Sequence, residues 1–163
     1  MPYTFKHTVS SFSIWGRARW RTLAWVLLVA CTLAGCTHMQ LLASYDDKTY
    51  EETIRIGREV DVHYARLVEL APELRHYAAS APQYVEIEAD IRSLVRRNAA
   101  RPLNEESQKI SGQILKFWTQ YRDKHREKDA YPDARFDSDR FSRLFNAAVA
   151  AEEVKRLQTD DRN

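Results

Sequence analysis

The sequence predicts an all-α protein, an antiparallel bundle of about four amphipathic helices that follows a cleaved signal peptide. Three observations favour this fold class. Beyond residue 46 apolar residues recur at intervals of three and four, no alternating pattern typical of a strand competes with them, and glycine after residue 36 is confined to Gly57 and Gly112. A chain of 163 residues is long enough for one such domain, which we place at residues 47–163.

The first helix is expected to begin at an Asp47 cap, whose carboxylate can accept hydrogen bonds from free backbone N–H groups. Pro72 and Pro82 bracket the break that should follow this helix, because proline lacks the N–H that a helix interior needs. Two apolar rows at helical spacing form a broad stripe for burial. The rows are Tyr50, Ile54, Gly57, Tyr64, Val68 and Ala71, and Ile56, Val60, Leu67, Leu70 and Leu74.

Two further helices are expected before Pro132. The second stops before Pro102, and the third begins at an Asn104 cap and decays in the charged run 122–129. Their apolar positions repeat at three and four: Tyr84, Ile87, Ile91, Leu94 and Val95 in the second, and Ile110, Ile114, Phe117, Trp118 and Tyr121 in the third.

A fourth helix is expected from an Asp137 cap, because Phe136 and Phe141 flank that residue at the spacing of a hydrophobic staple. It carries Phe141, Leu144, Phe145, Ala148 and Ala151. The aromatic residues of the four segments predict a bundle core with tyrosine hydroxyls at the surface. The alternative is that part of this aromatic stripe lines a groove for a partner helix or a lipid chain.

Residues 1–35 have the layout of a secretory signal peptide. Lys6, Arg17, Arg19 and Arg21 precede an apolar run from Leu23 to Gly35, and no acidic residue occurs in this leader. A run of about a dozen residues suits a signal peptide and falls short of the roughly 18 to 20 that span a bilayer. Positive charge ahead of the run keeps the N-terminus in the cytoplasm, so we expect export of the remainder.

The apolar run ends in Leu33-Ala34-Gly35-Cys36, which resembles the lipobox of bacterial lipoproteins at all four positions. The resemblance implies lipid attachment to the Cys36 sulfur and cleavage between Gly35 and Cys36. Two or three acyl chains, at about 0.8 kcal/mol per buried methylene, would anchor the protein stably in a bilayer. Thr37 in place of aspartate favours, by resemblance to the enterobacterial sorting rule, the outer membrane, with the domain facing the periplasm.

Residues 36–46 are expected to be a short lipidated tether between the membrane and the bundle. An extended chain spans at most about 3.3–3.6 Å per residue, so this tether would keep the domain close to the bilayer. A looser resemblance, carried by the segment 42–46 and by Tyr84 and Ile91 in the following helices, is to small helical proteobacterial lipoproteins without assigned function. It supports the architecture alone.

Charge and cysteine content narrow the classes of partner. The chain has 25 lysines and arginines against 23 acidic residues, and because four of the basic residues lie in the leader, the rest has a formal charge of −2. A nearly neutral surface lacks the excess of positive charge that attracts nucleic acid, so no nucleic-acid partner is expected. Cys31 and Cys36 are the only cysteines, which excludes an intramolecular disulfide or a thiolate metal site after residue 36.

Few residues are candidates for chemistry. Glu73 and His76 have the Glu-x-x-His spacing of di-iron bundles, but such a site needs a second copy of the motif and two more glutamates. Glu59 and His63 are one helical turn apart, and His38 and His125 are expected to be exposed. Glycine-rich phosphate loops and the common zinc and serine-nucleophile motifs are absent from the sequence. We therefore expect no enzyme, no cofactor and no metal.

The sequence thus predicts a membrane-anchored, periplasm-facing protein that acts as a non-catalytic interaction or accessory module of the cell envelope. Its expected partners are the lipid bilayer, through acylated Cys36, and an envelope protein. The alternative is a helical lipoprotein that binds a lipid or a small apolar ligand in a cavity between its helices.

Overall fold

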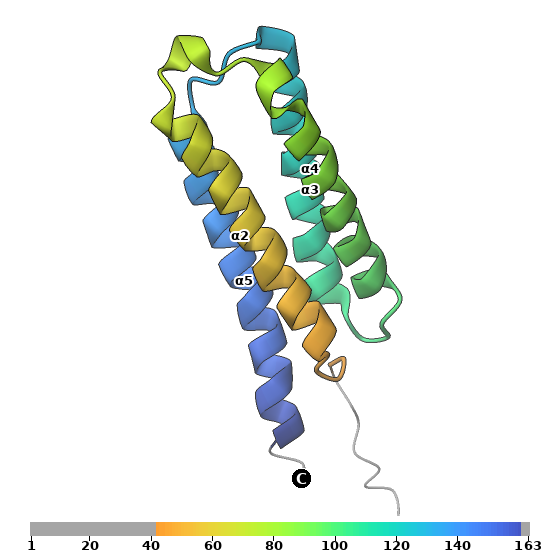
Figure 1. Ribbon diagram of the computed structural model, residues 1–163. Helices are drawn as coiled ribbons and strands as arrows, with labels where there is room; N and C mark the ends of the chain where they lie inside the picture. Colours follow the sequence, from red (N-terminus) through yellow and green to blue (C-terminus); the bar gives the residue numbers. More distant parts are fainter. Residues whose placement is uncertain (1–41, 161–163) are drawn as a thin grey trace, which may run out of the picture. The chain divides into compact units, whose positions relative to one another are not determined.

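Four long helices make up most of the region that the structure, a computed structural model, describes, which is residues 42–160 (Figure 1). No strand occurs in this region. The elements in order are α2 (Asp47–Glu69), the short 3-10 helix η1 (Pro72–Leu74), α3 (Tyr77–Ala99), α4 (Glu105–Lys128) and α5 (Ala134–Asp160).

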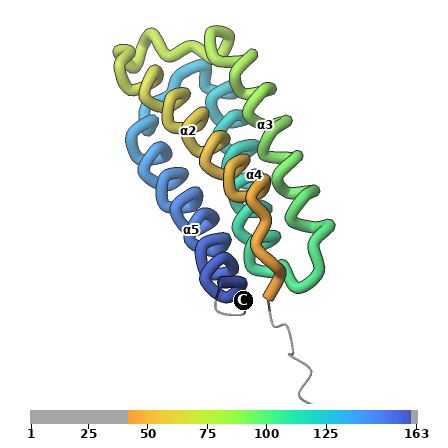
Figure 2. The backbone as a smooth tube through the Cα atoms, turned by 60° about the horizontal axis from the view of Figure 1, so that its bottom comes forward, coloured from red at the N-terminus to blue at the C-terminus, as the bar shows by residue number. Residues whose placement is uncertain are grey.

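The helices form an antiparallel up-down-up-down bundle (Figures 1 and 2). α2 packs against α3 and α5, and α4 packs against the same two helices. The α2–α5 and α3–α4 pairs make the most extensive contacts. This arrangement confirms the predicted fold class, and the weaker α2–α3 pairing leaves room for a surface groove between those helices.

The first helix is capped one residue earlier than predicted. Asp46, not Asp47, precedes the helix, and its carboxylate accepts hydrogen bonds from the Lys48 N–H at 3.3 Å and from the Thr49 hydroxyl at 2.6 Å. The segment before α2 is bound to the bundle at this end, because the Ala43 N–H donates to the Leu103 carbonyl at 3.0 Å and Ala43 is buried. Part of the predicted tether therefore contacts the bundle.

The predicted break after the first helix is present, but its expected end at Pro82 is wrong, because α3 begins at Tyr77 and Pro82 lies inside it. Pro82 is the sixth residue of α3, so the helix lacks the single hydrogen bond that an N–H at this position would donate to the carbonyl four residues earlier. A distant residue supplies the cap: Asp129 accepts a hydrogen bond from the Tyr77 N–H at 2.8 Å and pairs with His76 at 3.1 Å. Asp129 itself ends α4 in the left-handed conformation, with φ of 47°.

The boundaries of the last two helices also differ from the prediction. α4 continues through the charged run to Lys128, since one face of that run is buried. α5 begins at Ala134, so Asp137 is not a cap but a buried residue of the first turn, and Phe136 is 57% exposed and forms no staple.

The core is rich in aromatic residues, as predicted. Trp118 is fully buried and donates its indole N–H to the Tyr84 carbonyl at 3.2 Å. The expectation that tyrosine hydroxyls reach the surface is wrong for Tyr64 and Tyr84, because both hydroxyls find buried partners. The core residues are Ile56, Val60, Tyr64, Leu67, Tyr84, Ile87, Ile91, Leu94, Ile114, Trp118, Tyr121, Tyr131, Ala134, Phe141, Phe145 and Ala148.

A buried polar cluster closes the bundle at the end where the chain enters. The Lys155 ammonium donates to Asn104 Oδ1 at 2.5 Å, Ser107 Oγ at 2.6 Å and Glu152 Oε1 at 2.5 Å. Arg101 bonds both Glu152 and the Ser44 carbonyl, which ties the chain before α2 to the α3–α4 loop and to α5. Among the described helices, none combines the length and apolar character required to cross a bilayer.

Candidate functional site

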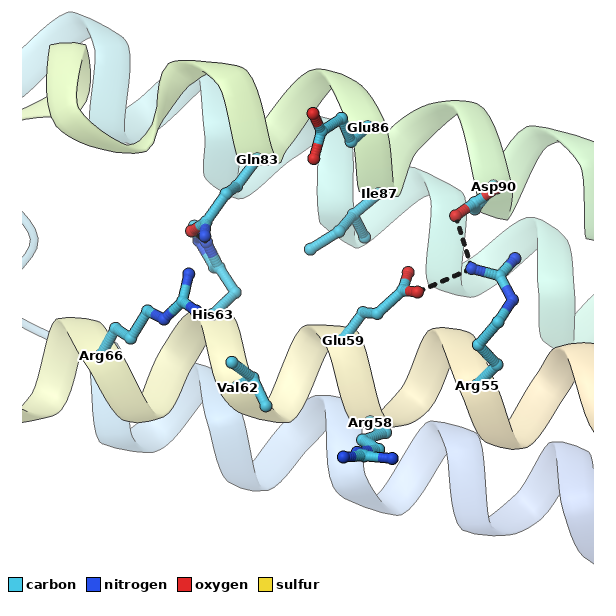
Figure 3. Close-up of a pocket in the computed structure, with 10 residues that line it drawn as sticks. All are labelled: Arg55, Arg58, Glu59, Val62, His63, Arg66, Gln83, Glu86, Ile87 and Asp90. Atoms are coloured by element: carbon cyan, nitrogen blue, oxygen red, sulfur yellow. Dashed lines mark hydrogen bonds and ion pairs between the residues drawn. The ribbon is translucent and has the colours of Figure 1, made fainter.

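A groove with a volume of about 710 Å³ lies between α2 and α3 (Figure 3). It forms because these two helices pack less extensively than the α2–α5 and α3–α4 pairs. We call it the α2–α3 groove. Its lining residues are Arg55, Arg58, Glu59, Val62, His63 and Arg66 of α2 and Gln83, Glu86, Ile87 and Asp90 of α3.

Two contacts bridge the helices and bound the groove along its length. Arg55 donates to Glu59 of its own helix at 2.7 Å and to Asp90 of α3 at 2.8 Å, and Figure 3 shows this ion triad at one side of the hollow. His63 Nδ1 lies 3.3 Å from Gln83 Oε1. At 1.5 Å rise per residue, Arg55 and His63 are about 12 Å apart along α2. The space between the bridges can receive a side chain or a short polypeptide segment.

Each wall of the α2–α3 groove carries a charged side chain that has no ion-pair partner among the described residues. The side chains of Arg66 in α2 and Glu86 in α3 make no hydrogen bond or ion pair with any other described residue. Val62, which is 41% exposed, adds an apolar contact next to the buried Ile87. The groove therefore offers a cation, an anion and a small apolar surface to an incoming group.

His63 lies at the buried edge of the groove, with 1% of its surface exposed. Because an amide oxygen only accepts hydrogen bonds, Nδ1 carries the proton that it donates to Gln83. Nε2 is buried and has no hydrogen-bond partner. Burial lowers the pKa of this imidazole to about 4, so His63 is neutral near pH 7.

Aromatic rings surround His63 on its inner side. Its ring centroid lies 4.6 Å from that of Tyr84, 5.3 Å from that of Trp118 and 5.3 Å from that of Tyr64. This packing fixes the ring and shields it from water. A general base must reach the proton that it abstracts, and the arrangement suits His63 better to a structural role than to proton transfer.

A second, smaller hollow of about 250 Å³ lies between the end of α4 and the start of α5. Lys124, Lys128 and Arg140 line it together with Asp137. Tyr131 donates its hydroxyl to Asp137 Oδ2 at 2.6 Å, and burial raises the pKa of the Asp137 carboxyl. This contact could not be predicted from local sequence patterns, because it depends on how the α4–α5 loop folds back.

The structure does not bring the predicted Glu-x-x-His pair onto one helical face. Glu73 belongs to η1, whereas His76 precedes α3 and pairs with Asp129, so the break between these elements separates the two side chains. Glu59 and His63 do not pair either, because Glu59 binds Arg55 and His63 binds Gln83.

The prediction that His125 is exposed is wrong. It is 1% exposed and lies on the inner face of α4. Its Nε2–H donates to the Arg75 carbonyl at 2.7 Å, and its Nδ1 accepts from the Tyr84 hydroxyl at 3.2 Å. Its spacing from Trp118 and Tyr121, which continues the core row of α4, was a signal in the sequence that pointed to burial.

Cys36, Gly35 and His38 lie outside the described residues. Within residues 42–160, no three histidine, cysteine or acidic side chains are grouped so that they could hold a metal ion. No protein-family model, no curated protein and no solved structure matches the chain. The fold and the groove therefore define the class of protein as a small four-helix bundle with a charged surface groove.

Proposed function

We propose that this chain is a lipid-anchored protein of a bacterial envelope that acts as a non-catalytic interaction module, facing the periplasm from the outer membrane. The observation that carries the proposal is the complete lipobox Leu33-Ala34-Gly35-Cys36 close to a folded domain. Ala43 is already bonded to the bundle, and the seven residue-to-residue steps from Cys36 to Ala43 span at most about 25 Å. A partner would thus meet the bundle close to the membrane surface.

The α2–α3 groove is the surface that we assign to a protein partner. Arg66 and Glu86 offer opposite charges on its two walls, and the hollow between the two bridges has room for a protruding side chain. Opposed charges of this kind give orientation and specificity more than raw affinity. A polar segment of an envelope protein with an acidic and a basic group fits this groove.

A lipid or another small apolar ligand is less well supported than a protein partner. Such a ligand needs a mainly apolar cavity, whereas charged side chains line both hollows described above. Bound lipid that co-purifies with the domain lacking its own acyl chains would favour this alternative.

In vivo photo-crosslinking tests the assignment. A photoreactive residue replaces Val62 in the groove or, as a matched control, Val85, which is 64% exposed on the outer face of α3. We expect one reproducible protein adduct from position 62 and none from position 85. Arg66→Glu should reduce the adduct at least several-fold, and Cys36→Ser should reduce it because the unlipidated, uncleaved precursor does not reach the outer membrane.

Equal labelling from both positions, or an adduct that persists unchanged in Arg66→Glu, would contradict the role of the groove. Palmitate label that persists in the Cys36→Ser protein would instead contradict the anchor. The two parts of the proposal therefore fail separately.

A further inference from the structure

α5 carries apolar residues on two opposite faces. Phe141, Phe145 and Ala148 point into the bundle and are buried. At about 100° per residue, the opposite face presents Ala147, Ala150, Val154 and Leu157. All four are exposed, Val154 to 48% and Leu157 to 58%. We call these four residues the outer stripe.

The outer stripe has the spacing of a coiled-coil seam. Its members are separated by three, four and three residues, which places Ala147 and Val154 at a positions and Ala150 and Leu157 at d positions of two heptads. In the second heptad, Val154 at a with Leu157 at d is a combination that favours two parallel strands, and in the first heptad both positions are alanine.

We propose that the outer stripe pairs with the same stripe of a second copy of this chain, so that two α5 helices run parallel to each other. This inference rests on the proposed anchor in one respect, the shared orientation. The C-terminal end of α5 and the segment before α2 lie at the same end of the bundle (Figures 1 and 2). Two copies held in one membrane would therefore present their α5 helices side by side in the same direction.

The residues that flank the seam fit a parallel pair. Glu153 of one copy would face Gln158 of the other, and Asn146 would face Ala151, so no like charges oppose each other. Glu153 is also held by Arg156 of its own helix at 2.6 Å. Arg143 occupies the next d position toward the start of α5, where it would face the like-charged Arg143 of the second copy. The contact is therefore confined to the two heptads at the end where the chain enters.

Two heptads bury less area than the roughly 1,200–2,000 Å² of a stable interface. Confinement to one membrane raises the effective concentration of the copies and compensates for a weak contact. We therefore infer a dimer that forms on the membrane and dissociates in dilute solution.

Disulfide cross-linking of the full chain in its native membrane tests this inference. Val154→Cys and Leu157→Cys are introduced singly, and Val85→Cys on α3, at 64% exposure, is the matched control. With a mild oxidant, both α5 variants should give at least fivefold more disulfide-linked dimer than Val85→Cys. A yield equal to that of Val85→Cys would overturn the pairing.

The orientation has its own test. When Ala147→Cys and Leu157→Cys are expressed together with distinct tags, a parallel pair gives same-variant dimers, whereas a predominance of mixed dimers would overturn the parallel arrangement. The parent chain without an added cysteine reports on the anchor, because a lipidated Cys36 cannot form a disulfide. Cross-linking of the parent would contradict the proposed anchor and leave the comparison of α5 with α3 intact.

Discussion

Burial of His63 as a neutral imidazole makes the stability of the bundle depend on pH. The folded-state pKa of about 4 lies below the ordinary value of 6.5. Between these values the unfolded chain binds more protons than the folded one, so the free energy of unfolding falls as the pH falls. The contribution is fully present above pH 6.5 and is lost once the pH reaches 4.

The size of this effect follows from the two pKa values. From pH 7 the His63 contribution should fall by about 2 kcal/mol at pH 5 and by about 3 kcal/mol at pH 4. Burial also lowers the pKa of His125, which adds to the loss. The raised pKa of Asp137 acts in the opposite direction, so His63 must be isolated by a variant.

His63→Gln removes the titrating group and keeps a polar side chain that can face Gln83. Urea unfolding followed by circular dichroism at several pH values between 7 and 4 gives the free energy of unfolding of both proteins. The advantage of the wild type over His63→Gln should shrink by about 3 kcal/mol across this range. Parallel curves for the two proteins would refute the assignment of a neutral, desolvated imidazole.

Two further predictions concern packing and buried charge. A Cβ atom on Gly57 would lie 3.1 Å from the Phe145 ring, whereas one on Gly112 would meet nothing within 4 Å. Gly112→Ala should therefore stabilise the protein by about 0.5–1 kcal/mol, and Gly57→Ala should be less stable than Gly112→Ala by about 1–3 kcal/mol in thermal unfolding; equal effects would show that α2 and α5 are not this close. Lys155→Met removes the cation that bonds Asn104, Ser107 and Glu152 and should cost about 3 kcal/mol. A loss below about 1 kcal/mol in urea unfolding would mean that this cluster is open to water.

The fold was predictable because its signal is local. Apolar spacing of three and four is set by the helix period, and it identified most of the core, including Ile56, Tyr84, Trp118 and Phe141. Helix ends were less predictable. α3 starts before Pro82 because Asp129, 52 residues away, caps Tyr77, and such a contact leaves no mark on the neighbouring sequence.

The candidate site was harder to predict than the fold. The sequence singled out His63 only with Glu59, its neighbour on the same helix, whereas its partner in the structure is Gln83 of α3. Arg66 and Glu86 lie on opposite walls of the groove only because α2 and α3 pack side by side in the fold. The lipobox, in contrast, is a local motif, and the assignment of Cys36 stays a prediction.

The mass of the mature N-terminus tests the anchor most directly. The protein is extracted from membranes of cells labelled with palmitate, and the N-terminal peptide is analysed by mass spectrometry beside that of Cys36→Ser. We predict a peptide that begins at Cys36 and carries two or three labelled acyl chains, and an unlabelled, uncleaved precursor in the variant. An unmodified Cys36, or label that persists in Cys36→Ser, would contradict the account.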